Sequence, residues 1–172
     1  MTNGDRNQVV LVDETDNVVG YEEKYAAHKN PVPLHRAISV VIYDQGRKRM
    51  LLQKRVGSKP TWPLYWSNAV CTHPMDGESY EDCAHRRLKE EFGFDTKLEE
   101  KYRFTYEADY DGEWGEHEFD VVFTGVYEDS VKPNPEEVAE YKWIDIQELE
   151  KDLQENPKLY TPWFKMIIES LG

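Results

Sequence analysis

Apolar and polar residues follow spacings that predict strands along most of the chain. Leu34 to Tyr43 is dense in Val and Ile, as in a strand buried on both faces, and Met50 to Lys54 is expected to pair with it antiparallel. Two further strands, joined around an Asp-Gly turn, are predicted at Tyr102 to Tyr110 and Glu116 to Tyr127. Another strand is predicted at Tyr141 to Ile144. The pattern therefore predicts a sheet built largely from hairpins.

Capping signals predict helices between these strands. Ser79, with an acid three positions later, opens a helix that Gly93 is suited to end in the left-handed conformation. Asp145 is expected to cap a short helix. Thr161, which is followed by proline, is expected to cap the last helix. Glu22 to Lys29 also has helical character and is predicted as a further helix.

The beginning of the chain adds a short hairpin, with strands at Gln8 to Asp13 and Val18 to Gly20. Strands outnumber helices, so we expect an α+β fold with a mixed, mostly antiparallel sheet flanked by helices. The length of 172 residues fits one domain, and the chain has neither internal repeats nor low-complexity linkers. A single domain over residues 1–172 is predicted.

Charge limits the possible partners. The 21 basic and 34 acidic residues give a net charge of −13, which disfavours nucleic acid and anionic membranes. The sequence has neither an apolar run of spanning length nor a signal-peptide core, so a cytoplasmic location is expected. An anionic substrate would require a local cluster of Lys and Arg or a bound divalent cation.

Glu116 and Glu118 lie two apart in a predicted strand, so both side chains leave the same face. That face could simply be solvated. If imidazoles converge there, the carboxylates could instead form an octahedral site for Mg, Mn or Zn. The candidate imidazoles are His28, His35 and His73, although each could equally be a surface or capping histidine.

Cys71 and Glu91 each have both a structural and a chemical interpretation. Cys71 could be a packed thiol, but it lies in a loop-like segment where a nearby metal or helix N-terminus would favour the thiolate. Cys83 belongs to a helix and is predicted to pack. Glu91 borders the apolar stripe of the same helix, where it could pair with Arg87 or bind a metal facing a phosphate.

Several separated motifs, in order, closely resemble the type I isopentenyl-diphosphate isomerase family, from about Val10 to Trp163. The motifs are Lys24-Tyr25-Ala26-Ala27-His28, Leu34-His35, Trp66-Ser67-Asn68, Cys71-Thr72-His73-Pro74, Glu116-x-Glu118 and Thr161-Pro162-Trp163. The resemblance implies a Nudix-like fold, and Thr72 to Phe94 resembles a degenerate Nudix box. Thr72 replaces its first glycine and Arg87 its first helix-core glutamate, which argues against diphosphate hydrolysis.

The resemblance also implies roles for individual residues and an isomerase of isopentenyl and dimethylallyl diphosphate that acts by 1,3-proton transfer. The implied ligands of one divalent metal (Mn, Zn or Mg) are His28, His35, His73, Glu116 and Glu118. The implied substrate-binding residues are Lys24, Arg55, Lys59, Arg87 and Trp163. Glu91 is implied to bind a Mg²⁺ carried by the substrate diphosphate. Proton transfer is assigned to Cys71, Tyr106 and Glu118.

Two other functions remain open at this point. A Nudix hydrolase of a nucleoside diphosphate derivative would release phosphate or nucleotide and would be indifferent to Cys71. A Nudix-like binding module would turn over no diphosphate at all. In each case the expected partner is a small diphosphate, and the chain is expected to be a monomer.

Overall fold

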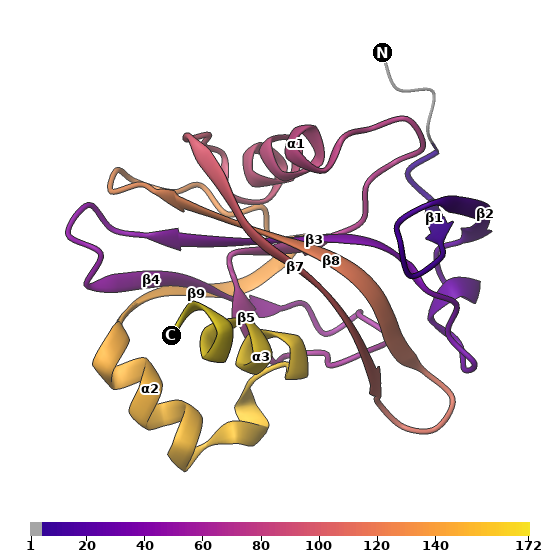
Figure 1. Ribbon diagram of the computed structural model, residues 1–172. Helices are drawn as coiled ribbons and strands as arrows, with labels where there is room; N and C mark the ends of the chain where they lie inside the picture. The colour runs from indigo at the N-terminus through magenta and orange to yellow at the C-terminus, as the bar shows by residue number, and fades with distance from the viewer. Residues whose placement is uncertain (1–4) are drawn as a thin grey trace.

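The structure is a computed structural model that describes residues 5–172, and it is built on one mixed sheet of nine strands (Figure 1). The strands are β1 (Gln8–Val12), β2 (Val18–Glu23), β3 (His35–Tyr43), β4 (Arg49–Arg55), β5 (Trp66–Asn68), β6 (Val70–Thr72), β7 (Leu98–Asp109), β8 (Gly115–Val126) and β9 (Val138–Asp145). The α-helices are α1 (Tyr80–Phe92), α2 (Ile146–Glu155) and α3 (Pro162–Leu171), with 3-10 turns η1 (Ala26–His28) and η2 (Pro157–Leu159). The predicted α+β class is confirmed.

Strand β3 lies at the centre of the sheet and brings distant parts of the chain together. It runs parallel to β8 along its whole length, from the pair His35 and Glu118 to the pair Tyr43 and Val126. It is antiparallel to β1, β4 and β6. Strand β4 in turn pairs antiparallel with β5 and β9, and β7 with β8. The sheet is therefore mixed and mostly antiparallel, as predicted.

Helices cover the sheet on both sides, with α1 on one side and α2 and α3 on the other (Figure 1). Successive residues of a strand face opposite sides. Ile38, Val40 and Ile42 of β3 accordingly pack in the core with α1, whereas Val41 packs with the residues of α3. Both faces of β3 are buried, which explains its nearly continuous apolar sequence.

Most of the predicted helix ends are confirmed. The Ser79 hydroxyl accepts a hydrogen bond from the amide three residues later, and Gly93 ends α1 with a φ of 72°. Asp145 accepts two backbone amides at the start of α2. Thr161 does precede α3, but its hydroxyl shares a hydrogen bond of 2.9 Å with Ser67 Oγ. The prediction that Thr161 caps α3 is correct in position, while its side chain links the helix to β5.

The predicted helix at Glu22 to Lys29 is wrong. Strand β2 continues to Glu23, which pairs with Gln8 of β1, and only the short turn η1 follows it. The β1–β2 ladder satisfies the backbone groups that a helix would have used. This correction matters for the site, because η1 turns His28 inward.

Among residues 5–172, no helix is long and apolar enough to cross a membrane.

Candidate active site

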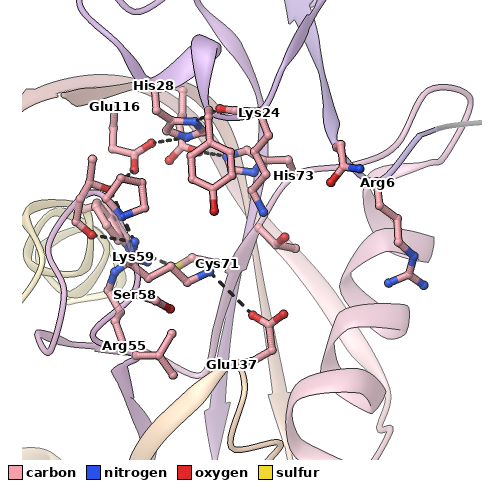
Figure 2. Close-up of a pocket in the computed structure, with 18 of the residues that line it drawn as sticks. Arg6, Lys24, His28, Arg55, Ser58, Lys59, Cys71, His73, Glu116 and Glu137 are labelled. Atoms are coloured by element: carbon pink, nitrogen blue, oxygen red, sulfur yellow. Dashed lines mark hydrogen bonds and ion pairs between the residues drawn. The ribbon is translucent and has the colours of Figure 1, made fainter. Parts of the chain in front are cut away.

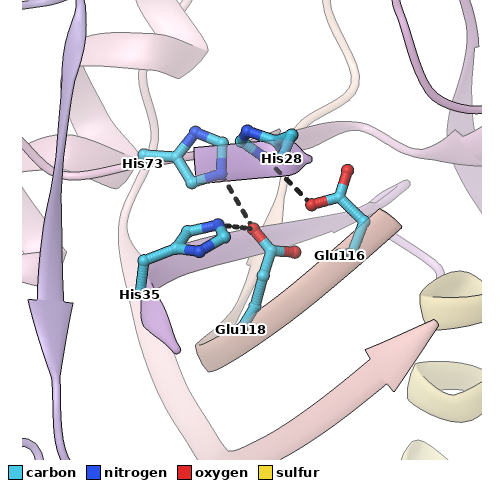
Figure 3. A group of neighbouring side chains, drawn as sticks. All are labelled: His28, His35, His73, Glu116 and Glu118. Atoms are coloured by element: carbon cyan, nitrogen blue, oxygen red, sulfur yellow. Dashed lines mark hydrogen bonds and ion pairs between the residues drawn. The ribbon is translucent and has the colours of Figure 1, made fainter. Parts of the chain in front are cut away.

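Three histidines from separate segments and two glutamates of β8 lie close together (Figure 3). One ligand atom from each lies within 4.8 Å of the others. His28 ends η1, His35 begins β3 and His73 directly follows β6. Because β3 and β8 pair in parallel with His35 opposite Glu118, the carboxylates of β8 reach the same point.

Backbone carbonyls hold two of the imidazoles in a ligand-like orientation. His28 Nδ1 lies 2.6 Å from the carbonyl oxygen of Lys24, and His35 Nδ1 lies 2.9 Å from that of Pro33. If each Nδ1 carries the proton and donates it, Nε2 is left with its lone pair toward the centre of the cluster. A second hydrogen bond of this kind is the usual support of a metal-binding histidine.

The carboxylates complete a donor set that fits a divalent cation. Glu116 is 5% exposed and Glu118 is 8% exposed, so the solvated-face interpretation is wrong. Within the described residues, His35 Nε2 and Glu116 Oε2 are buried without a hydrogen bond. Three nitrogens and two carboxylates suit a borderline or hard divalent metal. The cluster could therefore hold one metal ion.

The pKa shifts within the cluster also favour binding of a divalent metal ion. Burial lowers the pKa of His28, but the Glu116 carboxylate outweighs burial and raises the pKa to about 9. Burial lowers the pKa of His73 to about 3. Burial also raises the pKa of Glu118, yet the neighbouring imidazoles of His35 and His73 bring it well below its usual range. The carboxylates thus gather positive charge, which a divalent cation would supply directly.

A cavity of about 270 Å³ opens beside the cluster (Figure 2). Lys24, Arg55 and Lys59 line it together with residues of the cluster. Arg87 lines an adjoining cavity of about 200 Å³ that shares Lys24 with the first. Four basic side chains therefore surround connected space, as a diphosphate group requires.

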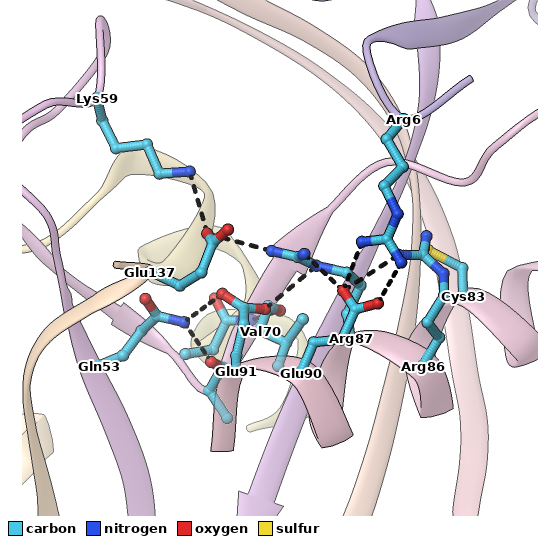
Figure 4. Close-up of polar contacts among 12 residues, drawn as sticks. Arg6, Gln53, Lys59, Val70, Cys83, Arg86, Arg87, Glu90, Glu91 and Glu137 are labelled. Carbon is cyan, nitrogen blue, oxygen red and sulfur yellow. Dashed lines mark hydrogen bonds and ion pairs between the residues drawn. The ribbon is translucent and has the colours of Figure 1, made fainter. Parts of the chain in front are cut away.

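A carboxylate that the sequence analysis missed lies among these basic residues (Figure 4). Glu137 Oε2 is 3.2 Å from Arg87 Nη2 and 3.7 Å from Lys59 Nζ. Burial, followed by the nearby charges of Lys59 and Arg87, lowers the pKa of Lys24. The local positive charge is thus balanced by an internal acid.

Glu91 extends from α1 into the same region and is only 3% exposed. Its Oε1 accepts a hydrogen bond of 3.3 Å from Gln53, and its Oε2 lies 3.8 Å from Arg87 Nε. The Arg87 pairing is therefore present but long, and burial raises the pKa of Glu91 to about 7. A buried carboxylate with one weakly engaged oxygen is compatible with metal binding as well as with the ion pair.

Cys71 lies in strand β6, so the prediction that it occupies a loop is wrong. Its thiol donates to Asn68 Oδ1 at 3.1 Å and its sulfur accepts from Trp163 Nε1 at 3.1 Å. Burial raises the thiol pKa to about 12, which favours the neutral thiol over the thiolate that a nearby metal or helix N-terminus would favour. Cys83, by contrast, is fully buried in the core as predicted.

Tyr106 and Glu118 are paired in register on β7 and β8, and the Tyr106 hydroxyl donates to Glu118 Oε1. The other oxygen of Glu118 lies 2.9 Å from His73 Nε2. Burial, together with the neighbouring carboxylates, raises the pKa of Tyr106 well above its usual value. Glu118 and Cys71 line the same cavity, as does Trp163. An acid and a thiol from different strands thus border one enclosed space.

One buried acid near Cys71 was not predicted. Asp120 Oδ2 accepts a hydrogen bond of 2.7 Å from Ser39, whose hydroxyl lies 3.6 Å from Cys71 Sγ. The signal was present in the sequence, because Asp120 continues the two-residue spacing of Glu116 and Glu118 on β8.

Comparison with known proteins agrees with this architecture. Residues 33–164 match the model of the NUDIX domain, so the chain is a Nudix-domain protein. A crystal structure of a Deinococcus radiodurans protein superposes with a TM-score of 0.71 over 87% of this chain and 90% of that one, at 18% identity. This likeness concerns the fold alone.

Two bacterial proteins are much more similar in sequence. Isopentenyl-diphosphate Delta-isomerase 2 of Aromatoleum aromaticum is 40% identical over 95% of this chain and 85% of its own length. Isopentenyl-diphosphate Delta-isomerase of Serratia proteamaculans is 40% identical over 95% of this chain and 90% of its own. The chain belongs to the isopentenyl-diphosphate Delta-isomerase family.

Proposed function

We propose that this protein interconverts isopentenyl diphosphate and dimethylallyl diphosphate by a 1,3-allylic proton transfer. One observation carries the proposal: Cys71 and Glu118 border the same cavity from different strands, beside basic side chains suited to a diphosphate. The similarity to isomerases over 95% of the chain supports the same reaction.

The reaction adds a proton to one carbon and removes another proton two carbons away. Glu118, with Tyr106 as its hydrogen-bonded relay, is proposed to act on one face of the alkene, and Cys71 on the other. Positioned acids and bases of this kind each accelerate proton transfer by about 10²–10⁴. The neutral thiol of Cys71 suits a proton donor, and the ionised carboxylate of Glu118 suits an acceptor.

A carbocation-like state between the two transfers requires an apolar, dry surrounding. Trp163 is 2% exposed, its ring lines the cavity, and its indole nitrogen donates to Cys71 Sγ. The π-face of a tryptophan attracts a cation by about 2 kcal/mol or more where water is excluded. We therefore assign Trp163 to stabilising the cation and to orienting the thiol.

The metal assignment follows from the donor set. His28, His35, His73, Glu116 and Glu118 are proposed to hold one Mn, Zn or Mg ion, which when bound supplies positive charge that keeps a carboxylate ionised. Glu118 keeps its Oε1 hydrogen-bonded to Tyr106, so the relay is oriented by the chain itself.

Lys24, Arg55, Lys59 and Arg87 are proposed to bind the diphosphate, with Glu91 as ligand of a Mg²⁺ that the diphosphate carries. Arg87 stands where the Nudix box has a metal-binding glutamate, and its guanidinium instead contributes to the basic cavity. This replacement favours an isomerase over a hydrolase, because the positively charged Arg87 side chain, which is suited to binding phosphate, takes the place of one metal-binding carboxylate.

Incubation with isopentenyl diphosphate and Mg²⁺ in D₂O, followed by NMR, tests the proposal. Deuterium-labelled dimethylallyl diphosphate is the expected product. Release of phosphate would indicate the hydrolase instead, and an unchanged spectrum a binding module.

We also propose that residues 1–172 act as one domain and as a monomer in the cytoplasm, without nucleic-acid or membrane partners. The net charge of −13 supports this assignment, because it repels polyanions and favours solubility. Light scattering coupled to gel filtration, at several protein concentrations, would reveal any oligomer.

A further inference from the structure

The loop at 56–65, between β4 and β5, has an unusual backbone. Trp62 and Leu64 adopt positive φ angles of 44° and 63°, a region that residues other than glycine rarely occupy. Such conformations persist only where surrounding contacts hold them. Here the Arg55 guanidinium provides those contacts, since Nε donates to the Trp62 carbonyl at 3.1 Å and Nη2 to the Thr61 carbonyl at 3.0 Å.

Thr61 lies in the same loop and is only 2% exposed. Its hydroxyl donates to Glu116 Oε1 at 2.9 Å. The other oxygen, Oε2, is directed toward the cluster and lies 3.0 Å from His28 Nε2. The Thr61 hydroxyl therefore determines which oxygen of Glu116 is offered to a cation.

We propose that Thr61 is a positioning residue that connects the cation cluster to the diphosphate cavity. Its hydroxyl holds the Glu116 carboxylate, and its carbonyl holds the guanidinium of Arg55, which lines the cavity. The inference rests on the proposed function, because it assigns Glu116 to a metal and Arg55 to a diphosphate.

Two consequences follow from this connection. Hydrogen-bonded partners of metal-binding side chains commonly change metal affinity by about 10–100-fold when removed. A contact that serves both sites also couples them, so binding of a cation should tighten binding of a diphosphate, and the reverse by the same factor. Because the loop carries Lys59 as well, its conformation affects two of the basic residues at once.

The test uses chelator-treated full-length protein and Mn²⁺, with affinity measured by competition against a fluorescent chelator. Thr61→Val keeps the shape of the side chain and removes the hydroxyl, whereas Thr61→Ser keeps the hydroxyl and removes the methyl group. Metal affinity should fall about 10–100-fold in Thr61→Val and stay near the wild-type value in Thr61→Ser. Circular dichroism verifies that each variant is folded, and Thr61→Ala replaces the valine variant if that one does not fold.

The affinity for inorganic pyrophosphate with Mg²⁺ is then measured with and without Mn²⁺ in the cluster. The enhancement caused by Mn²⁺ should be smaller in Thr61→Val than in the wild type. Equal Mn²⁺ affinity in the wild type and Thr61→Val would overturn the role of the hydroxyl, and an equal enhancement would overturn the connection between the sites. If the wild type itself bound no Mn²⁺, the metal centre of the proposed function would fail, and this inference with it.

Discussion

The cation cluster and the diphosphate cavity are neighbours, yet they are built in opposite ways. In the cluster, four of the five side chains are buried, and backbone carbonyls orient His28 and His35. In the cavity, long side chains carry the charge, and Glu137 already pairs with Lys59 and Arg87. The cluster could hold a metal ion between side chains that are already fixed, whereas the proposed diphosphate would have to displace an internal acid to enter the cavity.

Cys71 lines the cavity beside the cluster. Its replacement should impair proton transfer without changing metal binding. Cys71→Ala should lower kcat by about 10²–10⁴-fold, because one of the two proton-transfer groups is lost. Turnover is measured by product formation, and metal content by elemental analysis, which should not change.

Cys83→Ala serves as the matched control, because the same truncation occurs in the core, away from the cavity. It should retain turnover with some loss of stability. Full activity of Cys71→Ala would contradict the assignment of this thiol.

Removal of a ligand from the cluster should affect metal retention far more than folding. Glu116→Gln keeps the shape of the side chain but loses its charge, so metal affinity should fall by about 10²-fold. Elemental analysis after gel filtration checks this expectation. Glu107→Gln, an exposed site on β7, makes the same change outside the cluster and should keep its metal. Equal stoichiometry in the two variants would count against a metal at Glu116.

Glu91 should make stability depend on pH. Its pKa of about 7 in the folded protein lies above the ordinary value of 4.5, so the folded state binds more protons between these pH values. Its contribution to stability is therefore complete below pH 4.5 and is lost as the pH rises through 7. In a chelator, Glu91→Gln should gain about 2–3 kcal/mol relative to the wild type between pH 5 and pH 8.

Urea unfolding of both proteins at the two pH values measures this difference. A constant difference between the two proteins at pH 5 and pH 8 would show that Glu91 is ionised throughout.

The smallest effect is expected for replacement of Glu137. This variant tests whether the internal acid of the cavity competes with an entering anion. Glu137→Gln removes the acid that competes with an anion, so affinity for inorganic pyrophosphate should rise about fivefold, with little effect on metal in the cluster. Calorimetry measures both affinities. Glu150→Gln on α2 changes the net charge equally and should leave pyrophosphate binding near the wild-type value. A similar gain in both variants would attribute the effect to overall charge.

The sequence predicted those parts of the site that depend on local spacing. The two-residue period of β8 placed Glu116 and Glu118 on one face, and the stripe of α1 identified Glu91. Thr61 and Glu137 were missed because their contacts depend on loop conformation and on neighbours far away in the chain. The burial of the carboxylates depended on the parallel pairing of β3 and β8, which no local pattern encodes.

The errors have similar physical causes. Residues 22–29 have helical character, but pairing of β2 with β1 overrides that preference. Cys71 was placed in a loop because β6 is only three residues long and lacks an alternating pattern. Burial in the cavity wall raises the pKa of Cys71 and favours its neutral thiol, whereas the sequence indicated a thiolate only with a metal or helix N-terminus nearby.

The alternation along β8 has a consequence for how this protein can change over evolutionary time. Inserting or deleting one residue of the strand after Glu118 would turn both carboxylates to the opposite face relative to the rest of β8 and bring His117 to the face they now occupy. The turn around Asp111, which joins β7 to β8, could absorb such a change without disturbing the register. Length variation among descendants of this gene should therefore be tolerated at that turn and purged from the strand beside it.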